Sequence, residues 1–189
     1  MTIDDRIRAA AAGPEPAFDA VTRDFLANCA DELRQRQRPG TLLDACDLGT
    51  SASWLWRLTF ATLGLRRDEG DHPVPAARHT VGVRFLPDYL RRADRFEMLL
   101  LMEPEKPFHP NLRGQHVCLE IYPGEPLVEI AEALHSLFSW RLRQLSETDA
   151  MDAEACAWGR ANLDALPLDT RPLFGRAIEW NLEPVEVGS

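Results

Sequence analysis

The sequence predicts a single α+β domain in the order helix, four antiparallel strands, irregular loop and further helices. Three observations predict this class. Apolar residues recur at helical spacing near both ends of the chain, they alternate over several short segments between those ends, and a proline-rich stretch separates the two regions. At 189 residues, the chain is long enough to bury the core of one compact domain. Strands grouped together rather than alternating with helices are typical of the α+β class.

The N-terminal part is predicted to hold one long helix. Residues 1–14 are Ala-rich and are expected to be loosely ordered, so that the folded domain begins at residue 15. Pro14 and Pro16 precede the helix, and Pro39-Gly40 ends it. The apolar residues at helical spacing between these limits are Phe18, Val21, Phe25, Cys29 and Leu33.

Four segments are predicted to be strands: 42–48, 54–63, 81–85 and 96–102. The clearest is 54–63, where aromatic and aliphatic side chains alternate on one face. The charged, proline-bearing residues 64–78 are predicted to form a loop, and Pro87-Asp88-Tyr89 is predicted to turn the chain. Consecutive strands joined by such loops predict a four-stranded antiparallel meander.

Residues 103–125 are predicted to be irregular, apart from a short extended piece at 117–121, because prolines interrupt the stretch repeatedly. A long irregular stretch inside a compact domain is usually functional. Helices are predicted over 127–142 and 151–163, the first with a continuous apolar face. The domain is expected to end near residue 165, and residues 166–189 are interpreted as a C-terminal extension with a short helix over 173–180.

Composition excludes several classes of function. A net charge of −9 argues against nucleic acid as a partner, because phosphate binding needs clustered Lys and Arg. No apolar run is long enough to span a bilayer, and the start of the chain has no signal-peptide core, so a membrane partner is not expected. The four cysteines are far apart in the sequence, which disfavours a zinc ribbon. We expect a cytoplasmic location, where thiols stay reduced.

The segment most informative about function runs from Phe108 to Cys118. A His109-Pro110-Asn111 tripeptide lies a short loop before a single cysteine, Cys118, in the stretch predicted to be irregular. A cysteine nucleophile must be accessible, and the oxyanion formed at the attacked carbonyl needs a fixed donor. Asn111 can supply that donor or brace the loop, while Pro110 fixes one backbone angle and His109 can hold the turn.

These residues resemble the active-site segment of ubiquitin-conjugating enzymes, and the resemblance covers about residues 15–165. Phe85-Leu86-Pro87-Asp88-Tyr89 is similar to the family's turn after its third strand. Phe108-His109-Pro110-Asn111-Leu112 and Val117-Cys118-Leu119 follow in the family's order, as do the helix from Leu127 and a second helix near Met151. The resemblance implies a ubiquitin-conjugating-enzyme-like fold: an N-terminal helix, a four-stranded antiparallel meander, an active-site loop and C-terminal helices.

The same resemblance implies an activity and its partners. An activating enzyme would pass the C-terminus of a ubiquitin-like modifier to Cys118 as a thioester, and an amine of a protein target would then attack it. Asn111 would stabilise the oxyanion or its loop. An acidic residue that helps the incoming amine would be Glu147, Asp149 or Asp152. No metal or organic cofactor takes part in this step.

The sequence departs from the family at several points. The spacing from Asn111 to Cys118 is one residue shorter than the family's, and Tyr122-Pro123-Gly124 stands where a tryptophan is usual. The Arg-, Ala- and Leu-rich composition is interpreted as that of a GC-rich bacterial genome. The chain therefore resembles prokaryotic members of ubiquitin-like conjugation operons, several of which are linked to antiphage defence.

Other interpretations of the same residues stay open. A non-catalytic relative would use the fold as a binding module for a modifier or a partner enzyme. An unrelated cysteine hydrolase would need a base such as His135 near Cys118, although His135 lies on the apolar helix face. His116, two residues before Cys118, could activate the thiol or could be solvated. A metal site from His109, His116, Cys118 and either Cys156 or His135 lacks any recognised spacing. Cys29 and Cys156 are predicted to be core residues, Cys46 core or partly exposed, and the five tryptophans packing residues.

Overall fold

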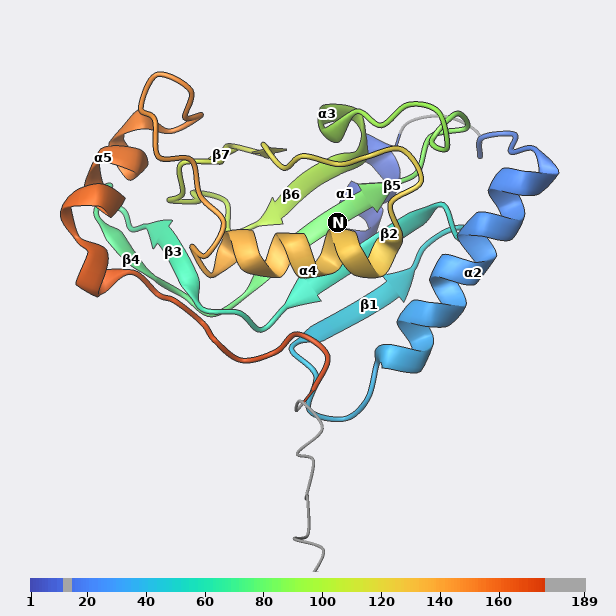
Figure 1. Ribbon diagram of the computed structural model, residues 1–189, viewed down its shortest axis with the longest axis horizontal. Coiled ribbons are helices and arrows are strands. Elements are labelled where there is room, and N and C mark those ends of the chain that lie inside the picture. Colours follow the sequence, from blue (N-terminus) through green and yellow to red (C-terminus); the bar gives the residue numbers. More distant parts are fainter. Residues whose placement is uncertain (12–14, 176–189) are drawn as a thin grey trace, which may run out of the picture.

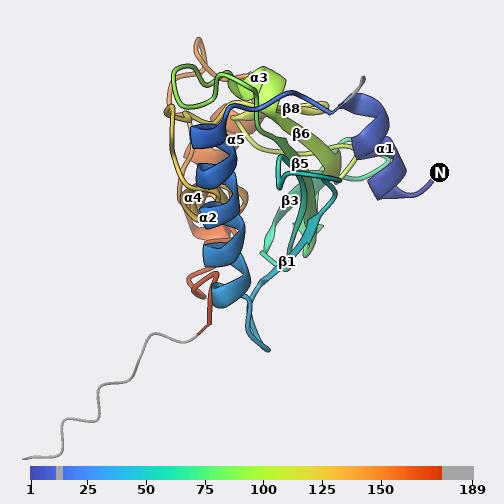
Figure 2. The ribbon, with the colours of Figure 1, turned by 90° about the vertical axis from the view of Figure 1, so that its right-hand side faces the viewer.

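The computed structural model describes residues 1–11 and 15–175. Its centre is a four-stranded antiparallel sheet in the order β1-β2-β5-β6, formed by Leu43–Asp47, Leu55–Phe60, His79–Arg84 and Leu99–Glu103. Helices α2 (Ala20–Arg36) and α4 (Leu127–Phe138) cover one face, and the short helix α1 (Ile3–Ala10) lies on the other (Figures 1 and 2). The predicted α+β class and four-stranded meander are confirmed.

The main core lies between the sheet and α4. The predicted apolar face of α4 is buried along its whole length, and Phe138 meets Phe60 of β2 edge to face, with ring centroids 5.3 Å apart. Strand β2 is buried on both faces because α4 covers one side of the sheet and α1 approaches the other. Each such fully buried aliphatic or aromatic side chain contributes about 1.5–3 kcal/mol to folding.

The expectation that residues 1–14 are loosely ordered is wrong for residues 3–10. They form α1, which begins with a reciprocal capping box between Thr2 and Asp5. Ile7 is 2% exposed and packs onto Gly82 of β5, where any added Cβ would come within 3.1 Å of the Ile7 side chain. A single buried residue in an Ala-rich segment leaves no apolar periodicity, which is why the helix escaped prediction.

Two further boundaries differ from the predicted ones. Residues 64–78 contain a hairpin of β3 (Gly64–Arg67) and β4 (Pro73–Ala76) rather than a loop. The predicted strand 96–102 begins as the one-turn helix α3 (Arg95–Met98), and β6 starts only at Leu99. Asp94 sets that turn by accepting a hydrogen bond from the Phe96 amide at 2.9 Å.

The irregular stretch and the later helices follow one another in the predicted order, but some of these elements begin or end at other residues than predicted. A small hairpin of β7 (Leu112–Arg113) and β8 (His116–Val117) replaces the extended piece expected over 117–121. Helix α4 ends at Phe138 rather than residue 142, because Trp140 adopts a left-handed backbone conformation with φ 61°. The last helix, α5, spans Ala153–Ala161, and a short 3-10 turn, η1, follows at Leu163–Ala165.

Residues beyond 165, where the domain was predicted to end, pack against the main core. Leu173 is 4% exposed in the main core, and its carbonyl accepts a hydrogen bond from the Leu42 amide at 3.0 Å. Asp169 is buried, pairs with Arg171 and accepts from the Leu63 amide at 3.1 Å. Most of the helix predicted over 173–180 lies outside the described residues, and Leu173–Gly175 form a turn and a bend.

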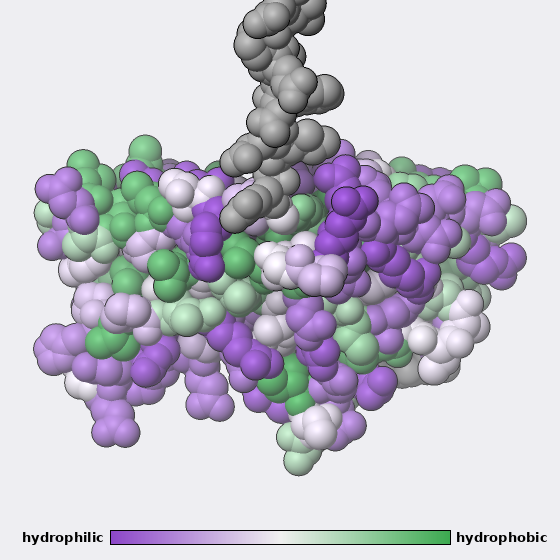
Figure 3. Space-filling model, turned by 90° about the horizontal axis from the view of Figure 1, so that it is seen from below, coloured by the Kyte–Doolittle hydropathy of each residue, from purple (hydrophilic) through white to green (hydrophobic). Residues whose placement is uncertain are grey.

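The surface mixes residue types. Seen from the side where the described chain ends, polar and apolar residues are interspersed, with no broad apolar face (Figure 3). Within residues 1–11 and 15–175, no helix is both long and apolar enough to cross a membrane.

If residues 166–175 belong to the domain, Leu173→Ala should lower the free energy of unfolding by about 2–4 kcal/mol, because it leaves a cavity in the main core. Leu168 lies in the same segment but is 48% exposed, so Leu168→Ala should cost less than about 1 kcal/mol. Urea denaturation of both variants measures the difference. Equal, small effects would place the end of the domain before this segment.

Candidate active site

The His109-Pro110-Asn111 turn is buried between the β3–β4 hairpin and the loop that precedes α5. The Phe108 amide donates to the Leu65 carbonyl of β3 at 3.2 Å, and the Pro110 carbonyl accepts from the Met151 amide at 2.8 Å. Phe108, His109 and Pro110 are all buried. The turn is therefore fixed from both sides, and Asn111 leaves it at a defined position.

His109 is a structural residue in this arrangement. Its Nδ1 accepts a hydrogen bond from the Asn111 amide at 3.0 Å, so the neutral ring carries its proton on Nε2. The ring is 1% exposed and lies edge-on to Trp140, with centroids 4.8 Å apart. Burial, with smaller contributions from His79 and Arg143, lowers the pKa of His109 to about 3. A neutral ring whose free lone pair is already engaged has no capacity to act as a general base.

Asn111 connects the two loops of the site. Its Nδ2 donates to the Cys118 carbonyl at 3.0 Å, and its Oδ1 accepts from the Gln144 amide at 2.8 Å. The backbone adds a third link, since the Cys118 amide donates to the Asn111 carbonyl at 2.8 Å. One N–H of the Asn111 amide is therefore engaged by the Cys118 carbonyl, so that here Asn111 braces the loop.

Cys118 follows β8 and is partly exposed, as a nucleophile requires. The hairpin before it is anchored by Leu112 and Val117, which are buried in the main core. Gly114 forms its turn with φ 57°, a conformation that strains other residues. This tight turn accommodates the short spacing between Asn111 and Cys118. Of the other cysteines, Cys29 and Cys156 are buried as predicted, and Cys46 is half-buried on β1.

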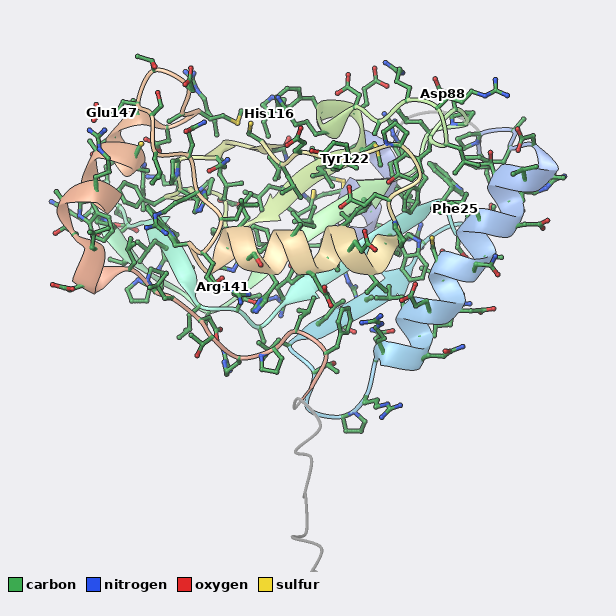
Figure 4. The ribbon with its side chains drawn as sticks, in the orientation of Figure 1. Phe25, Asp88, His116, Tyr122, Arg141 and Glu147 are labelled. Atoms are coloured by element: carbon green, nitrogen blue, oxygen red, sulfur yellow. The ribbon has the colours of Figure 1, made fainter. Side chains whose placement is uncertain are left out.

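The surface around this segment carries aromatic and charged side chains. His116 is exposed and packs edge-on against Phe96, with ring centroids 6.0 Å apart. In Figure 4, His116, Tyr122 and Glu147 all lie toward the rim formed by the irregular loops, above α4. All three side chains are exposed to solvent.

The three acidic candidates have different surroundings. Asp152 pairs with Arg67 at 2.7 Å and also caps α5 by accepting from the Ala155 amide at 2.9 Å, so both oxygens are engaged. Glu147 is exposed and pairs with Arg160. Asp149 is exposed and forms no ion pair with another described residue. Asp149 is thus the carboxylate that could meet an incoming amine without breaking an existing pair.

Several supporting residues were not predicted. Arg67, besides pairing with Asp152, places its guanidinium over the Phe108 ring, 4.7 Å from the centroid. Gly159 packs under Trp140, where a Cβ would come within 2.5 Å of the indole ring. An isolated glycine inside a helical pattern was the available signal, because such a glycine often marks close packing. Arg67 and the Gln144 amide carried no such signal.

His135 is buried on α4 with both ring nitrogens engaged. Its Nδ1 is 2.7 Å from the Thr62 hydroxyl, and its Nε2 is 2.9 Å from the Arg171 carbonyl. It is therefore a packing residue, and the hydrolase interpretation loses the base that it requires. Among the described residues, no three His, Cys, Asp or Glu side chains are grouped so as to hold a metal ion.

Comparison with known proteins returned solved structures only. No protein-family model matches the sequence, and no curated protein matches it. The ubiquitin-conjugating enzyme E2 UbcA1 from Agrocybe aegerita is 19% identical, with 64% of this chain and 83% of that chain covered and a TM-score of 0.46. Human ubiquitin-conjugating enzyme E2 G1 is 17% identical, with 65% and 98% covered and a TM-score of 0.45. At identities this low, the likeness concerns the fold alone.

The buried histidines should make folding stability sensitive to pH. Burial lowers the pKa of His79 from 6.5 to about 4, as it lowers that of His109 to about 3. The two neutral rings contribute fully to the free energy of unfolding above pH 6.5, the pKa of an unfolded histidine. This contribution is lost as the pH falls from 6.5 through the folded-state pKa values. Below pH 6.5, each histidine should lower the free energy of unfolding by at most about 1.4 kcal/mol for every pH unit. Urea denaturation between about pH 7 and pH 5 measures this slope.

His109→Gln should remove one of these contributions and flatten the slope, because an uncharged amide replaces the ring. His72→Gln is the matched control, since the His72 ring is exposed and folding leaves it in water. An unchanged slope in His109→Gln would mean that the His109 ring is not buried in its neutral form.

Proposed function

We propose that this chain is a conjugating enzyme for a ubiquitin-like modifier, with Cys118 as its thioester-forming nucleophile. The observation that carries the proposal is the buried His109-Pro110-Asn111 turn, from which Asn111 holds the backbone of a partly exposed cysteine. This arrangement meets the needs of acyl transfer: an accessible sulfur, a fixed amide beside it and a loop that keeps its shape. The ordered motifs of the sequence support the same interpretation.

The first step is an exchange of thioesters. The Cys118 thiolate attacks the C-terminal carbonyl of a modifier held as a thioester on an activating enzyme. A carbon–sulfur bond to Cys118 forms, the bond to the donor's sulfur breaks, and that sulfur leaves as a thiolate. No metal or organic cofactor is required for either bond change.

The second step transfers the modifier to a target. A neutral amine attacks the thioester on Cys118, a carbon–nitrogen bond forms, and Cys118 leaves as a thiolate. The developing oxyanion needs a donor, and Asn111 can provide one because its amide nitrogen carries two N–H groups, one of which donates to the Cys118 carbonyl. The proton lost by the amine passes to an acidic side chain or to water. We assign this role to Asp149 rather than to Glu147 or Asp152, both of which are held in ion pairs.

The cellular setting is part of the proposal. The Arg- and Ala-rich composition, together with the resemblance to prokaryotic conjugation systems, supports a bacterial cytoplasmic enzyme, with antiphage defence as its context. Its partners would be a ubiquitin-like modifier, an activating enzyme and a protein target.

The rival function is that of a non-catalytic binding module that keeps the fold for contact with a modifier or partner enzyme. A binding module needs no accessible cysteine and no amide fixed beside it. The presence of both Cys118 and Asn111, held together by two hydrogen bonds, favours the enzyme.

A thioester assay tests the carrier role. With a candidate ubiquitin-like modifier, the activating enzyme of that modifier and ATP, the chain should form a modifier-sized adduct on a non-reducing gel. The adduct should disappear with a thiol reductant and in Cys118→Ala, but should persist in Cys46→Ala, which removes the half-buried cysteine on β1. An adduct that survives reductant would contradict a thioester, and the lack of any adduct with active partners would favour the binding module.

Discharge of the loaded enzyme onto free lysine tests the acidic residue. Asp149→Asn should slow single-turnover discharge by at least about tenfold without slowing loading, because only the second step releases an amine proton. Glu147→Gln should leave discharge nearly unchanged. Asp152→Asn should mainly lower thermal stability, since it breaks the pair with Arg67. Full discharge activity in Asp149→Asn would remove Asp149 from the mechanism.

A further inference from the structure

The turn between β1 and β2 surrounds a carboxylate with hydrogen-bond donors. The carboxylate belongs to Glu15, which lies far away in sequence, just before α2. The Ser51 hydroxyl donates to it at 2.6 Å, the Ser51 amide lies 3.2 Å from both of its oxygens, and the Ala52 amide donates at 3.0 Å. The Thr50 hydroxyl donates as well. Two amides and two hydroxyls therefore converge on one anionic group.

The shape of this turn is set by contacts that do not involve Glu15. Asp47 accepts from the Gly49 amide at 3.0 Å and from the Ser53 hydroxyl at 2.6 Å. The Trp54 amide donates to the Ala52 carbonyl at 2.8 Å. A Cβ on Gly49 would lie 2.0 Å from that same carbonyl, so only glycine fits there. The donors are thus held in place by the turn itself rather than gathered by the carboxylate.

We infer that the turn of residues 49–53 is an anion-binding site for a carboxylate or phosphate group, and that Glu15 is its occupant within the chain. Consecutive backbone amides that point into one concavity, supplemented by hydroxyl groups, are a recurring way of binding such anions. The hydrogen bonds from Ser51 and Thr50 also lower the pKa of Glu15, which keeps the occupant ionised. None of these residues belongs to the candidate active site.

Because Glu15 occupies this site, the residues that precede α2 are attached to the β1–β2 turn. Glu15 follows α1 and precedes α2 in the sequence, and these two helices lie on opposite faces of the sheet (Figure 2). Glu15 fastens the segment that leads into α2 to the β1–β2 turn. Phe18, buried three residues later, fixes the other side of this attachment. A dissolved anion that takes the place of Glu15 would therefore detach the segment at this point.

Titration of Glu15→Ala with inorganic phosphate and with acetate tests the site. The backbone amide signals of Ser51 and Ala52 should shift in a saturable way, with a Kd of roughly millimolar for so exposed a site. In the unsubstituted chain, the apparent affinity should be at least about tenfold weaker, because the tethered Glu15 competes. Sodium chloride at matched ionic strength controls for screening.

Further variants separate the outcomes. Removing both hydroxyls in Glu15→Ala/Thr50→Val/Ser51→Ala should abolish saturation, and Glu15→Gln should admit phosphate more readily than Glu15 does while keeping the side chain's shape. Acetate binding as tight as phosphate would assign a carboxylate ligand, and tighter phosphate binding would assign a phosphoryl ligand. Linear shifts, equal shifts with chloride, or equal affinities with and without Glu15 would overturn the inference.

Discussion

The site depends above all on one side-chain amide. Asn111 donates to the carbonyl of Cys118 and accepts from the amide of Gln144, so a single planar group sets the separation of two loops. Both bonds require Asn111 to keep one position and one orientation, because a flipped amide would present a donor to a donor and an acceptor to an acceptor. The sulfur of Cys118 is thus positioned through the backbone of its own residue.

Buried side chains below the turn hold the Asn111 amide in place. His109 fixes the start of the turn through the Asn111 amide, and Trp140 packs against the His109 ring. Trp140 in turn needs the bare backbone of Gly159 beneath it. The arrangement buries a neutral imidazole, and burial lowers the pKa of that ring to about 3. The residues that stabilise the turn therefore also position Cys118, although only Asn111 contacts it.

The sequence predicted the elements that a local pattern of apolar residues encodes. Strand 54–63, strand 81–85 and the helix from Leu127 have strong periodicity, and the sequence singles out Asn111 and Cys118 as parts of one short motif. What escaped prediction depends on contacts distant in sequence. Helix α1 buries one isoleucine against Gly82, and α4 stops early because Trp140 turns to meet His109 and Gly159. Arg67 reaches Asp152 across 85 positions, a pairing that no local pattern announces.

One end of the β3–β4 hairpin contacts the candidate site and the other end is exposed to solvent. This difference makes the exposed end useful for labelling. Its stem contacts the site at two points, since Leu65 binds the Phe108 amide and Arg67 binds Asp152. Its tip, from Glu69 to His72, is exposed. Exposed tips of this kind accept inserted residues or chemical labels with little penalty. A fluorophore or spin label attached there would be connected through the hairpin to the loop that holds Phe108 and Asn111, and would report a displacement of that loop without touching Cys118.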